Sequence, residues 1–172
     1  YGLKFSAVPS WTLTTPLNMI GYSDASWGND SKTRKSYYGY LVFIESSLIS
    51  SRCKLTPEVA HSSCEAEYVA LDDAAREIFY IIQLTGELGL EVKQPVPLYC
   101  DSKGARHWAT NYMVNQKSKH IPIRYHYIRR LIKKNIIDVQ RVETEWNCAD
   151  IHTKHLGPNL FSYHRSSIVY DG

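Results

Sequence analysis

The pattern of hydrophobic and polar residues predicts a chain that begins with strands and then alternates helices with strands. Runs of apolar, β-branched and aromatic residues bounded by Gly, Pro, Asn or Ser are typical of strands. Such runs occur at residues 18–27, 37–45, 48–54, 96–101 and 136–142. The second and third runs are separated only by a short Ser-rich turn, which predicts that they form adjacent paired strands.

A helical period replaces the strand pattern from Ser62 onward. Apolar residues then recur three and four positions apart, as on one face of a helix, and they are Ala66, Val69, Ala70, Ala74, Ile78, Ile81, Ile82 and Leu84. Ser62 or Ser63 is the expected N-cap, and Gly86 and Gly89 are the expected stops.

Shorter helical stretches are predicted at 102–111, 124–134, 147–156 and 158–168. Together with the strands, they predict an α/β domain built on a mixed five-stranded sheet. The first three strands of this sheet are expected to be antiparallel, with helices packed over the sheet.

Length and composition predict one ordinary globular domain. The chain has 172 residues, of which 44% are hydrophobic and 22% charged, enough for a single core. Residues 1–17 have no clear period and are broken by Pro9 and Pro16. We interpret 1–17 as a lead-in segment and 18–172 as the domain.

Several classes of protein are disfavoured. No apolar run approaches the ~20 residues that span a bilayer, and the N-terminus lacks the pattern of a signal peptide. The four cysteines are widely spaced, without zinc-site spacing, which favours reduced thiols in an intracellular compartment. The net charge of +3 is by itself a weak argument for nucleic-acid binding.

Four acidic residues stand where predicted elements begin or end. Asp24 and Asp101 end strands, Glu67 opens the long helix, and Asp150 lies at the head of the 147–156 stretch. Carboxylates are costly to gather unless cations neutralise them, and two Mg²⁺ ions ~4 Å apart use such a cluster for phosphoryl displacement. A single Asp is more often a turn or cap residue, so the prediction of a metal-dependent nuclease depends on the combination.

A basic segment precedes the last strand. Between residues 117 and 134 no acid interrupts a series of cations, with His120 and His126 interleaved, and the cations are Lys117, Lys119, Arg124, Arg129, Arg130, Lys133 and Lys134. Such a segment can follow a phosphate backbone. Taken alone, a solvated helix face is the commoner explanation.

Five motifs follow one another between about residues 20 and 165, and they are Gly21-Tyr22-Ser23-Asp24-Ala25-Ser26, Ser62-Ser63-Cys64-Glu65-Ala66-Glu67-Tyr68, Tyr99-Cys100-Asp101-Ser102, Lys119-His120-Ile121-Pro122-Ile123-Arg124-Tyr125-His126, and Ala149-Asp150-Ile151-His152-Thr153-Lys154. In this order they resemble the motifs of a known family, the ribonuclease H domain of copia-type LTR retrotransposon polyproteins. The segment at Tyr1-Gly2-Leu3 is similar to the connection that follows the reverse transcriptase.

The resemblance implies an RNase H-like fold that cleaves the RNA strand of RNA–DNA hybrids with two Mg²⁺ ions, for which Mn²⁺ is expected to substitute. It implies a reverse transcriptase domain in the same polyprotein as partner, a cytoplasmic virus-like particle as location, and neither a membrane nor a small-molecule cofactor. The catalytic and metal-binding acids map onto Asp24, Glu67, Asp101 and Asp150. Expected contacts to the hybrid are Ser62, Ser63, Cys64, Ser102, Arg124, Arg129 and Lys133.

The choice between Glu65 and Glu67 as the helical acid follows from helix geometry. Residues three, four, seven and eight positions after Glu67 are apolar and share one helix face. That face places Glu67 over the sheet, and the helical repeat places Glu65 about 200° around the axis. Glu65 therefore remains an auxiliary candidate.

Departures from the family pattern are local. They include Cys64 in place of Thr, Ser102 in place of Asn and Pro122 in place of Asp. The chain also lacks the Gly-rich histidine loop of cellular enzymes, so His152 and His126 are the candidates for assisting product release, although an ordinary core or surface role is favoured for both.

Two other functions stay open. One is a domesticated or catalytically weak module that binds hybrids without turnover. The weaker alternative is an integrase-type transposase, which needs a differently spaced acid triad. The complete set of four acids favours the ribonuclease.

Overall fold

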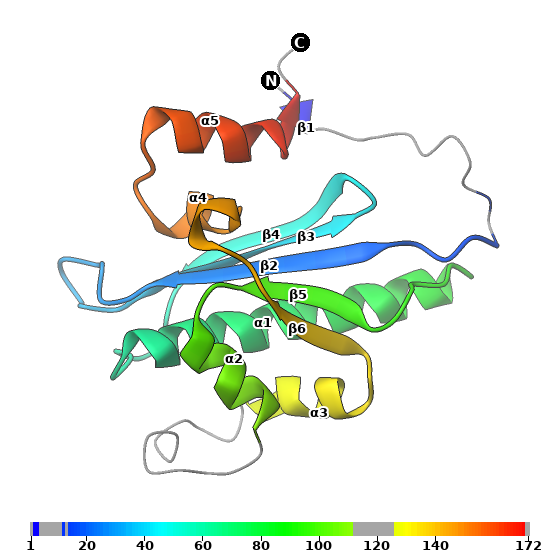
Figure 1. The fold of residues 1–172 in the computed structure, drawn as a ribbon, viewed down its shortest axis with the longest axis horizontal. Coiled ribbons are helices and arrows are strands. Elements are labelled where there is room, and N and C mark those ends of the chain that lie inside the picture. The colour runs from blue at the N-terminus through cyan, green and yellow to red at the C-terminus, as the bar shows by residue number, and fades with distance from the viewer. Residues whose placement is uncertain (1, 4–11, 13, 112–125, 171–172) are drawn as a thin grey trace.

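A central sheet organises the chain in the computed structural model, which describes residues 2–3, 12, 14–111 and 126–170 (Figure 1). Its strands are β2 (Met19–Ser26), β3 (Tyr37–Ile44), β4 (Ser47–Leu55), β5 (Val96–Cys100) and β6 (Ile137–Arg141). They lie in the order β4-β3-β2-β5-β6. The first three strands pair antiparallel, whereas β5 runs parallel to β2 and β6 runs parallel to β5. The predicted mixed five-stranded sheet is confirmed.

The strand register brings two predicted site residues to one edge of the sheet. Tyr22 of β2 lies opposite Tyr99 of β5 in a parallel pair. Two residues further along each strand, Asp24 and Asp101 follow in sequence. Because the carboxyl ends of parallel strands meet at the same edge, both acids emerge there.

Three helices cover one face of the sheet (Figure 1), and they are α1 (Ser63–Glu87), α2 (Lys103–Thr110) and α3 (Tyr127–Lys133). The inner face of α1 is fully buried at Leu71 and Ile78, which pack with Leu98 of β5 in the main core. Burial of side chains of this size stabilises the fold by about 1.5–3 kcal/mol each. Ser62, one of the two predicted N-caps, caps α1, and Ser102 caps α2.

The other face of the sheet carries α4 (Asp150–Thr153) and α5 (Pro158–Ser166). The helix expected over 147–156 is shorter in the structure, and a 3-10 turn at Thr144–Trp146 precedes it. A contact distant in sequence explains the difference: the side-chain amide of Asn147 donates to the carbonyl of Ser23 at 3.0 Å and holds the chain at Asn147 outside the helix.

A second sheet joins the two ends of the chain. Strand β1 (Gly2–Leu3) pairs antiparallel with β7 (Val169–Tyr170). The sequence did not predict this sheet because two-residue strands carry no readable period. The boundary at residue 17 stays a prediction. Among the described residues, no helix combines the length and apolar character needed to cross a bilayer.

Candidate active site

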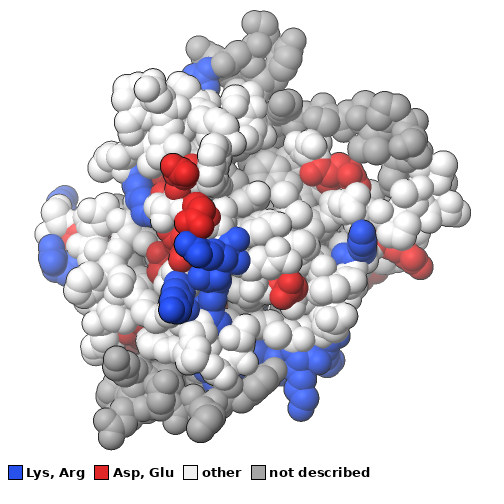
Figure 2. Space-filling view, viewed as in Figure 1, with Lys and Arg blue, Asp and Glu red and all other residues white. Residues whose placement is uncertain are grey.

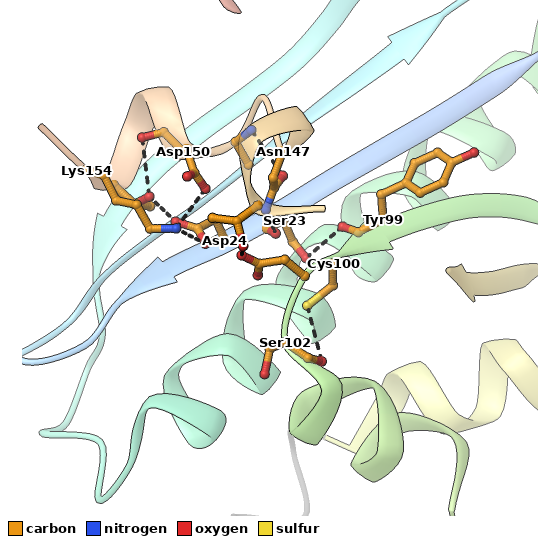
Figure 3. Close-up of polar contacts among 12 residues, drawn as sticks. Ser23, Asp24, Tyr99, Cys100, Ser102, Asn147, Asp150 and Lys154 are labelled. Carbon is orange, nitrogen blue, oxygen red and sulfur yellow. Dashed lines mark hydrogen bonds and ion pairs between the residues drawn. The ribbon is translucent and has the colours of Figure 1, made fainter. Parts of the chain in front are cut away.

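Asp24 and Asp150 converge on one ammonium group at the carboxyl edge of the sheet (Figure 3). The Nζ atom of Lys154 lies 3.1 Å from Oδ1 of Asp24 and 2.9 Å from Oδ1 of Asp150. Both carboxylates are buried, so water screens this charge pairing weakly. The strand end and the short helix α4, far apart in sequence, therefore share a single cation.

The second oxygen of Asp24 is also occupied. The hydroxyl of Thr153 donates to Oδ2 of Asp24. Thr153 and Lys154 lie at the end of α4, three and four residues after Asp150. One turn of α4 thus supplies both partners of the strand acid as well as an acid of its own.

Glu67 points from α1 into the same region. Its side chain is only 8% exposed, and Oε2 has no hydrogen-bond partner among the described residues. Burial, followed by the negative charges of Asp24 and Asp101, raises the pKa of Glu67 to about 10. A buried acceptor without a donor is rare in native proteins, and a bound cation is one ordinary explanation.

Asp101 completes the set from the loop after β5. Its Oδ2 accepts a hydrogen bond from the hydroxyl of Thr144 at 2.8 Å. Ligand atoms of Glu67, Cys100 and Asp101 all lie within 4.8 Å of one another. The four predicted acids therefore divide into two adjoining groups, with Asp24 and Asp150 around Lys154 in one and Glu67 and Asp101 in the other.

These groups fit divalent cations unequally. Among the described residues, Oε2 of Glu67 has no hydrogen-bond partner, and a Glu67 carboxylate oxygen lies within 4.8 Å of one from Asp101. Two carboxylates suit a hard cation such as Mg²⁺, whereas the thiol of Cys100, the third group nearby, does not. Between Asp24 and Asp150, the Lys154 ammonium contacts one oxygen of each carboxylate. A metal ion held by Asp24 and Asp150 would have to displace the Lys154 ammonium.

The pKa values follow from this crowding. Burial, with a further contribution from the charge of Asp24, raises the pKa of Asp150 to about 7, although Lys154 opposes the shift. Burial lowers the pKa of Lys154, but the charges of Asp24 and Asp150 outweigh it and the net shift is upward. Lys154 therefore keeps its positive charge, while the pKa values of Glu67 and Asp150 are raised.

Glu65 has a different role, at the start of α1. The N–H of Glu65 donates to the Ser62 hydroxyl at 3.2 Å, and Oε2 of Glu65 accepts from the N–H of His61 at 2.7 Å. This arrangement is a variant of the capping box. The side chain of Glu65 is thus held at the helix terminus, whereas that of Glu67 reaches the acids.

The predicted hybrid contacts near the acids lie at the starts of α1 and α2. Ser63 is exposed in the first turn of α1, and Cys64 is half-buried beside Gly104 of α2. A Cβ atom at Gly104 would approach Sγ of Cys64 to 2.7 Å, so the glycine permits this close packing. The hydroxyl of Ser102 accepts from the N–H of Ala105 at 3.3 Å. Nucleic-acid contacts by these residues remain a prediction.

The basic helix α3 differs from the expectation at Arg129. This side chain is 7% exposed, its Nε donates to the carbonyl of Trp108 at 2.9 Å, and its guanidinium lies 6.0 Å from the ring centroid of Tyr68. Arg129 therefore packs in the interior between helices, and the prediction that it contacts phosphate does not agree with this position. Lys133 is exposed, as the prediction requires, and Arg124 lies outside the described residues.

The two histidine candidates occupy structural positions. Nδ1 of His126 lies 3.0 Å from the hydroxyl of Tyr68. His152 packs against Gly39 of β3, and its carbonyl accepts from Sγ of Cys53 at 3.0 Å. Burial lowers the pKa of both imidazoles. The sequence favoured an ordinary core or surface role for both, and assistance in product release stays a prediction.

Sequence reasoning missed the polar residues that hold the acids in place. They are Thr144, Asn147, Thr153 and Lys154. The spacing of Lys154 four residues after Asp150 is a signal that could have been used, because residues at this spacing meet on a helix. Asn147 carries no such signal, since its partner is distant in sequence.

Sheet order, helix placement and the acids at the strand ends together define an RNase H-like domain. Solved structures share the fold: the N-terminal RNase H domain of rv2228c from Mycobacterium tuberculosis has a TM-score of 0.54 at 13% identity, covering 88% of this chain and 98% of that one. RNase H1 from Halobacterium salinarum NRC-1 has a TM-score of 0.51 at 14% identity, covering 79% of this chain and 94% of that one. At these identities the likeness shows the fold alone.

The sequence relatives give the particular family. The chain is 38% identical over 141 residues to the retrovirus-related Pol polyprotein from transposon TNT 1-94 of Nicotiana tabacum, which covers 82% of the chain. It is 35% identical over 152 residues to that from transposon RE1 of Arabidopsis thaliana, which covers 88% of the chain. The chain spans 10% of the length of each polyprotein. No protein-family model matches. The chain belongs with these Pol polyproteins as an RNase H-fold segment, and the resemblance seen in its motifs is confirmed.

Proposed function

We propose that this domain is a ribonuclease H that hydrolyses the RNA strand of RNA–DNA hybrids, beside a reverse transcriptase domain of the same polyprotein. The observation that carries the proposal is the convergence of Glu67 and Asp101 with the pair Asp24 and Asp150 at one sheet edge. A binding function alone gives no reason to gather four carboxylates, three of them buried, because burying charge is unfavourable.

Divalent cations bound to the four acids would activate water and stabilise the leaving oxygen, which is the chemistry that two Mg²⁺ ions supply in phosphoryl transfer. The chain's own residues prepare the site for that chemistry. Glu67 offers an unpaired oxygen at the sheet edge, and Thr144 orients the Asp101 carboxylate. Thr153 and Lys154 hold Asp24 in one orientation. Burial of Asp24, Glu67 and Asp150 strengthens the charge interactions among them.

The choice of RNA over DNA would depend on the 2′-hydroxyls, which only the RNA strand carries. Polar groups at the starts of α1 and α2 lie beside the acids, and Ser63 is exposed there. These groups are the candidates for reading the hydroxyls across the minor groove.

Hydrolysis of a labelled RNA–DNA hybrid in Mg²⁺ or Mn²⁺ tests the proposal. We expect cleavage within the RNA strand by the natural chain, loss of cleavage in Asp101→Asn and Glu67→Gln, and near-normal cleavage in the control Glu65→Gln. Cleavage of duplex DNA or of single-stranded RNA should be absent. Tight hybrid binding by the natural chain without hydrolysis would overturn the enzyme in favour of a binding module.

A further inference from the structure

A groove of about 540 Å³ opens directly beside Asp101, between α2 and β6. Its polar lining comes from Lys103, Arg106, His107 and Thr110 of α2, and from Arg141 at the end of β6. Figure 2 shows lysine and arginine side chains gathered next to acidic ones on the face where α2 and β6 lie. The groove therefore continues the acidic site with a surface of opposite charge.

The cations of the groove are positioned by the backbone of α2 and by weak surface pairing. Nε of Arg106 donates to the carbonyl of Ser102 at 3.4 Å, which turns the guanidinium back toward the start of α2 beside Asp101. Arg141 pairs with Glu143 at 2.9 Å, but the arginine side chain is 65% exposed. Exposed pairs of this kind contribute at most about 1 kcal/mol. A phosphate can therefore compete with Glu143 for Arg141.

The composition of the groove distinguishes between kinds of ligand. Among the described residues, no Phe, Tyr or Trp lines it, so the large rings on which bases usually stack are missing there. Lysine, arginine and threonine side chains are the groups that bind phosphate oxygens without reading sequence. A polyanionic backbone fits this lining better than a base or an apolar segment does.

We propose that this groove binds the phosphate backbone of the RNA strand next to the bond that is cleaved. The inference rests on the proposed function, which places the scissile phosphate at Asp101. The groove begins at the same residue, so the strand that enters it is the cleaved strand. Arg129 of α3, which the sequence predicted as a phosphate contact, is buried and does not take this role.

Equilibrium binding measures the contribution of the groove without hydrolysis. Fluorescence anisotropy of a labelled hybrid would be followed in the Glu67→Gln background, in which cleavage is expected to be silent. Adding Lys103→Gln and Arg106→Gln is expected to weaken binding about 10-fold at moderate salt. It should lower the slope of log K against log salt by about 2, because each lost phosphate contact removes about 0.9.

The matched control is the pair Lys54→Gln and Lys93→Gln, which removes the same charge from exposed positions outside the groove and outside α3. This control should leave both affinity and salt slope near the reference values. Lys103→Arg with Arg106→Lys should retain most of the affinity, because the charges are kept. Equal losses in the groove pair and in the control pair would show a general charge effect and overturn the proposal.

Neutral methylphosphonate linkages identify the strand. Placed in the RNA strand beside the scissile position, they should weaken binding of the reference protein and have little effect on the groove variant. The same linkages in the DNA strand should weaken both proteins equally. A loss that follows the DNA strand would overturn the assignment.

The two proposals fail differently. If hybrids bind through the groove and the natural chain does not hydrolyse them, the ribonuclease proposal fails and the groove stands. If the natural chain hydrolyses hybrids and the groove variant, with Glu67 restored, does so with unchanged KM, the groove proposal fails and the ribonuclease stands.

Discussion

The ammonium of Lys154 lies 2.9 Å from Oδ1 of Asp150, a residue one helical turn earlier in the sequence. The same ammonium lies 3.1 Å from Asp24, so a single side chain counters two buried carboxylates. This arrangement gives the acidic cluster an internal cation. It links the stability of the domain to the chemistry of its candidate active site.

Replacing Lys154 by Met is expected to destabilise the protein in the absence of divalent cations. Removal of one partner leaves buried charge uncompensated, which should cost about 3 kcal/mol in the free energy of unfolding at pH 8. The loss should be smaller at pH 5, because the pKa of Asp150 is raised to about 7 and its carboxyl then takes up a proton. Urea denaturation in a chelator at the two pH values measures both effects.

The control Lys154→Arg keeps the charge and should retain most of the stability. Addition of Mg²⁺ is expected to stabilise Lys154→Met more than the natural chain. In the variant, Mg²⁺ can bind Asp24 and Asp150 without displacing the Lys154 ammonium. Equal stabilisation by Mg²⁺ in both proteins would contradict competition between Lys154 and metal.

Glu67 gives the folded state a distinct pH dependence. Its pKa rises from 4.5 to about 10 in the folded protein, so between these values the folded state binds more protons than the unfolded state. Stability then falls as pH rises through this window, and Asp150 adds a fall between 3.8 and about 7. In a chelator, Glu67→Gln is therefore expected to raise the melting temperature at pH 8. In Mg²⁺, the same substitution should abolish cleavage.

Thermal melts at pH 5 and pH 8 measure this difference. The gain from Glu67→Gln should be larger at pH 8 and should shrink when Mg²⁺ is added, since a bound cation stabilises the ionised natural side chain. Glu65→Gln serves as control, because Glu65 caps α1 and lies outside the cluster. If the natural chain and Glu67→Gln had the same melting temperature at pH 8 in the chelator, burial of the Glu67 carboxyl would not destabilise the folded protein.

The acids could be predicted from sequence because their settings are local. Asp24 and Asp101 end apolar runs, and the apolar face of α1 selects Glu67 over Glu65. Strand order and helix faces then bring these positions together by general rules of α/β folds. The fold and the identity of the cluster follow from such local patterns.

The positions that required the structure depend on distant contacts. Asn147 bonds to Ser23, which no local pattern relates to it. Arg129 belongs to a basic amphipathic period that reads equally as a solvated face, and its burial arises only because Trp108 and Tyr68 pack over it. Short-range periodicity cannot report either relationship.

Substitution of Arg129 tests its interior role. Arg129→Gln removes the hydrogen bond to Trp108 and the contact with Tyr68 and leaves a buried carbonyl unpaired. We expect a loss of about 2–4 kcal/mol in unfolding free energy. The salt dependence of hybrid binding, measured under conditions where the variant remains folded, should not change. A reduced salt slope with normal stability would restore Arg129 as a phosphate contact.

Gly39 controls how closely α4 approaches the sheet. A Cβ atom at this position would lie 2.7 Å from the carbonyl oxygen of Arg52 and 3.0 Å from Cβ of His152. Gly39 also pairs in register with Asp24, and His152 belongs to the helix that carries Asp150. Gly39→Ala is therefore expected to displace α4, with a loss of about 1–3 kcal/mol from overpacking and a fall in hydrolysis.

Gly86 provides the matched control for the same substitution. It lies in the last turn of α1, and nothing is within 4 Å of a Cβ atom placed there. Gly86→Ala should leave hydrolysis unchanged and stabilise the protein by up to about 1 kcal/mol, because alanine loses less backbone entropy in a helix. Urea denaturation and hybrid cleavage of the two variants give the comparison. If Gly39→Ala matched Gly86→Ala in both measurements, α4 could not depend on the close approach at β3, and the placement of Asp150 would need another cause.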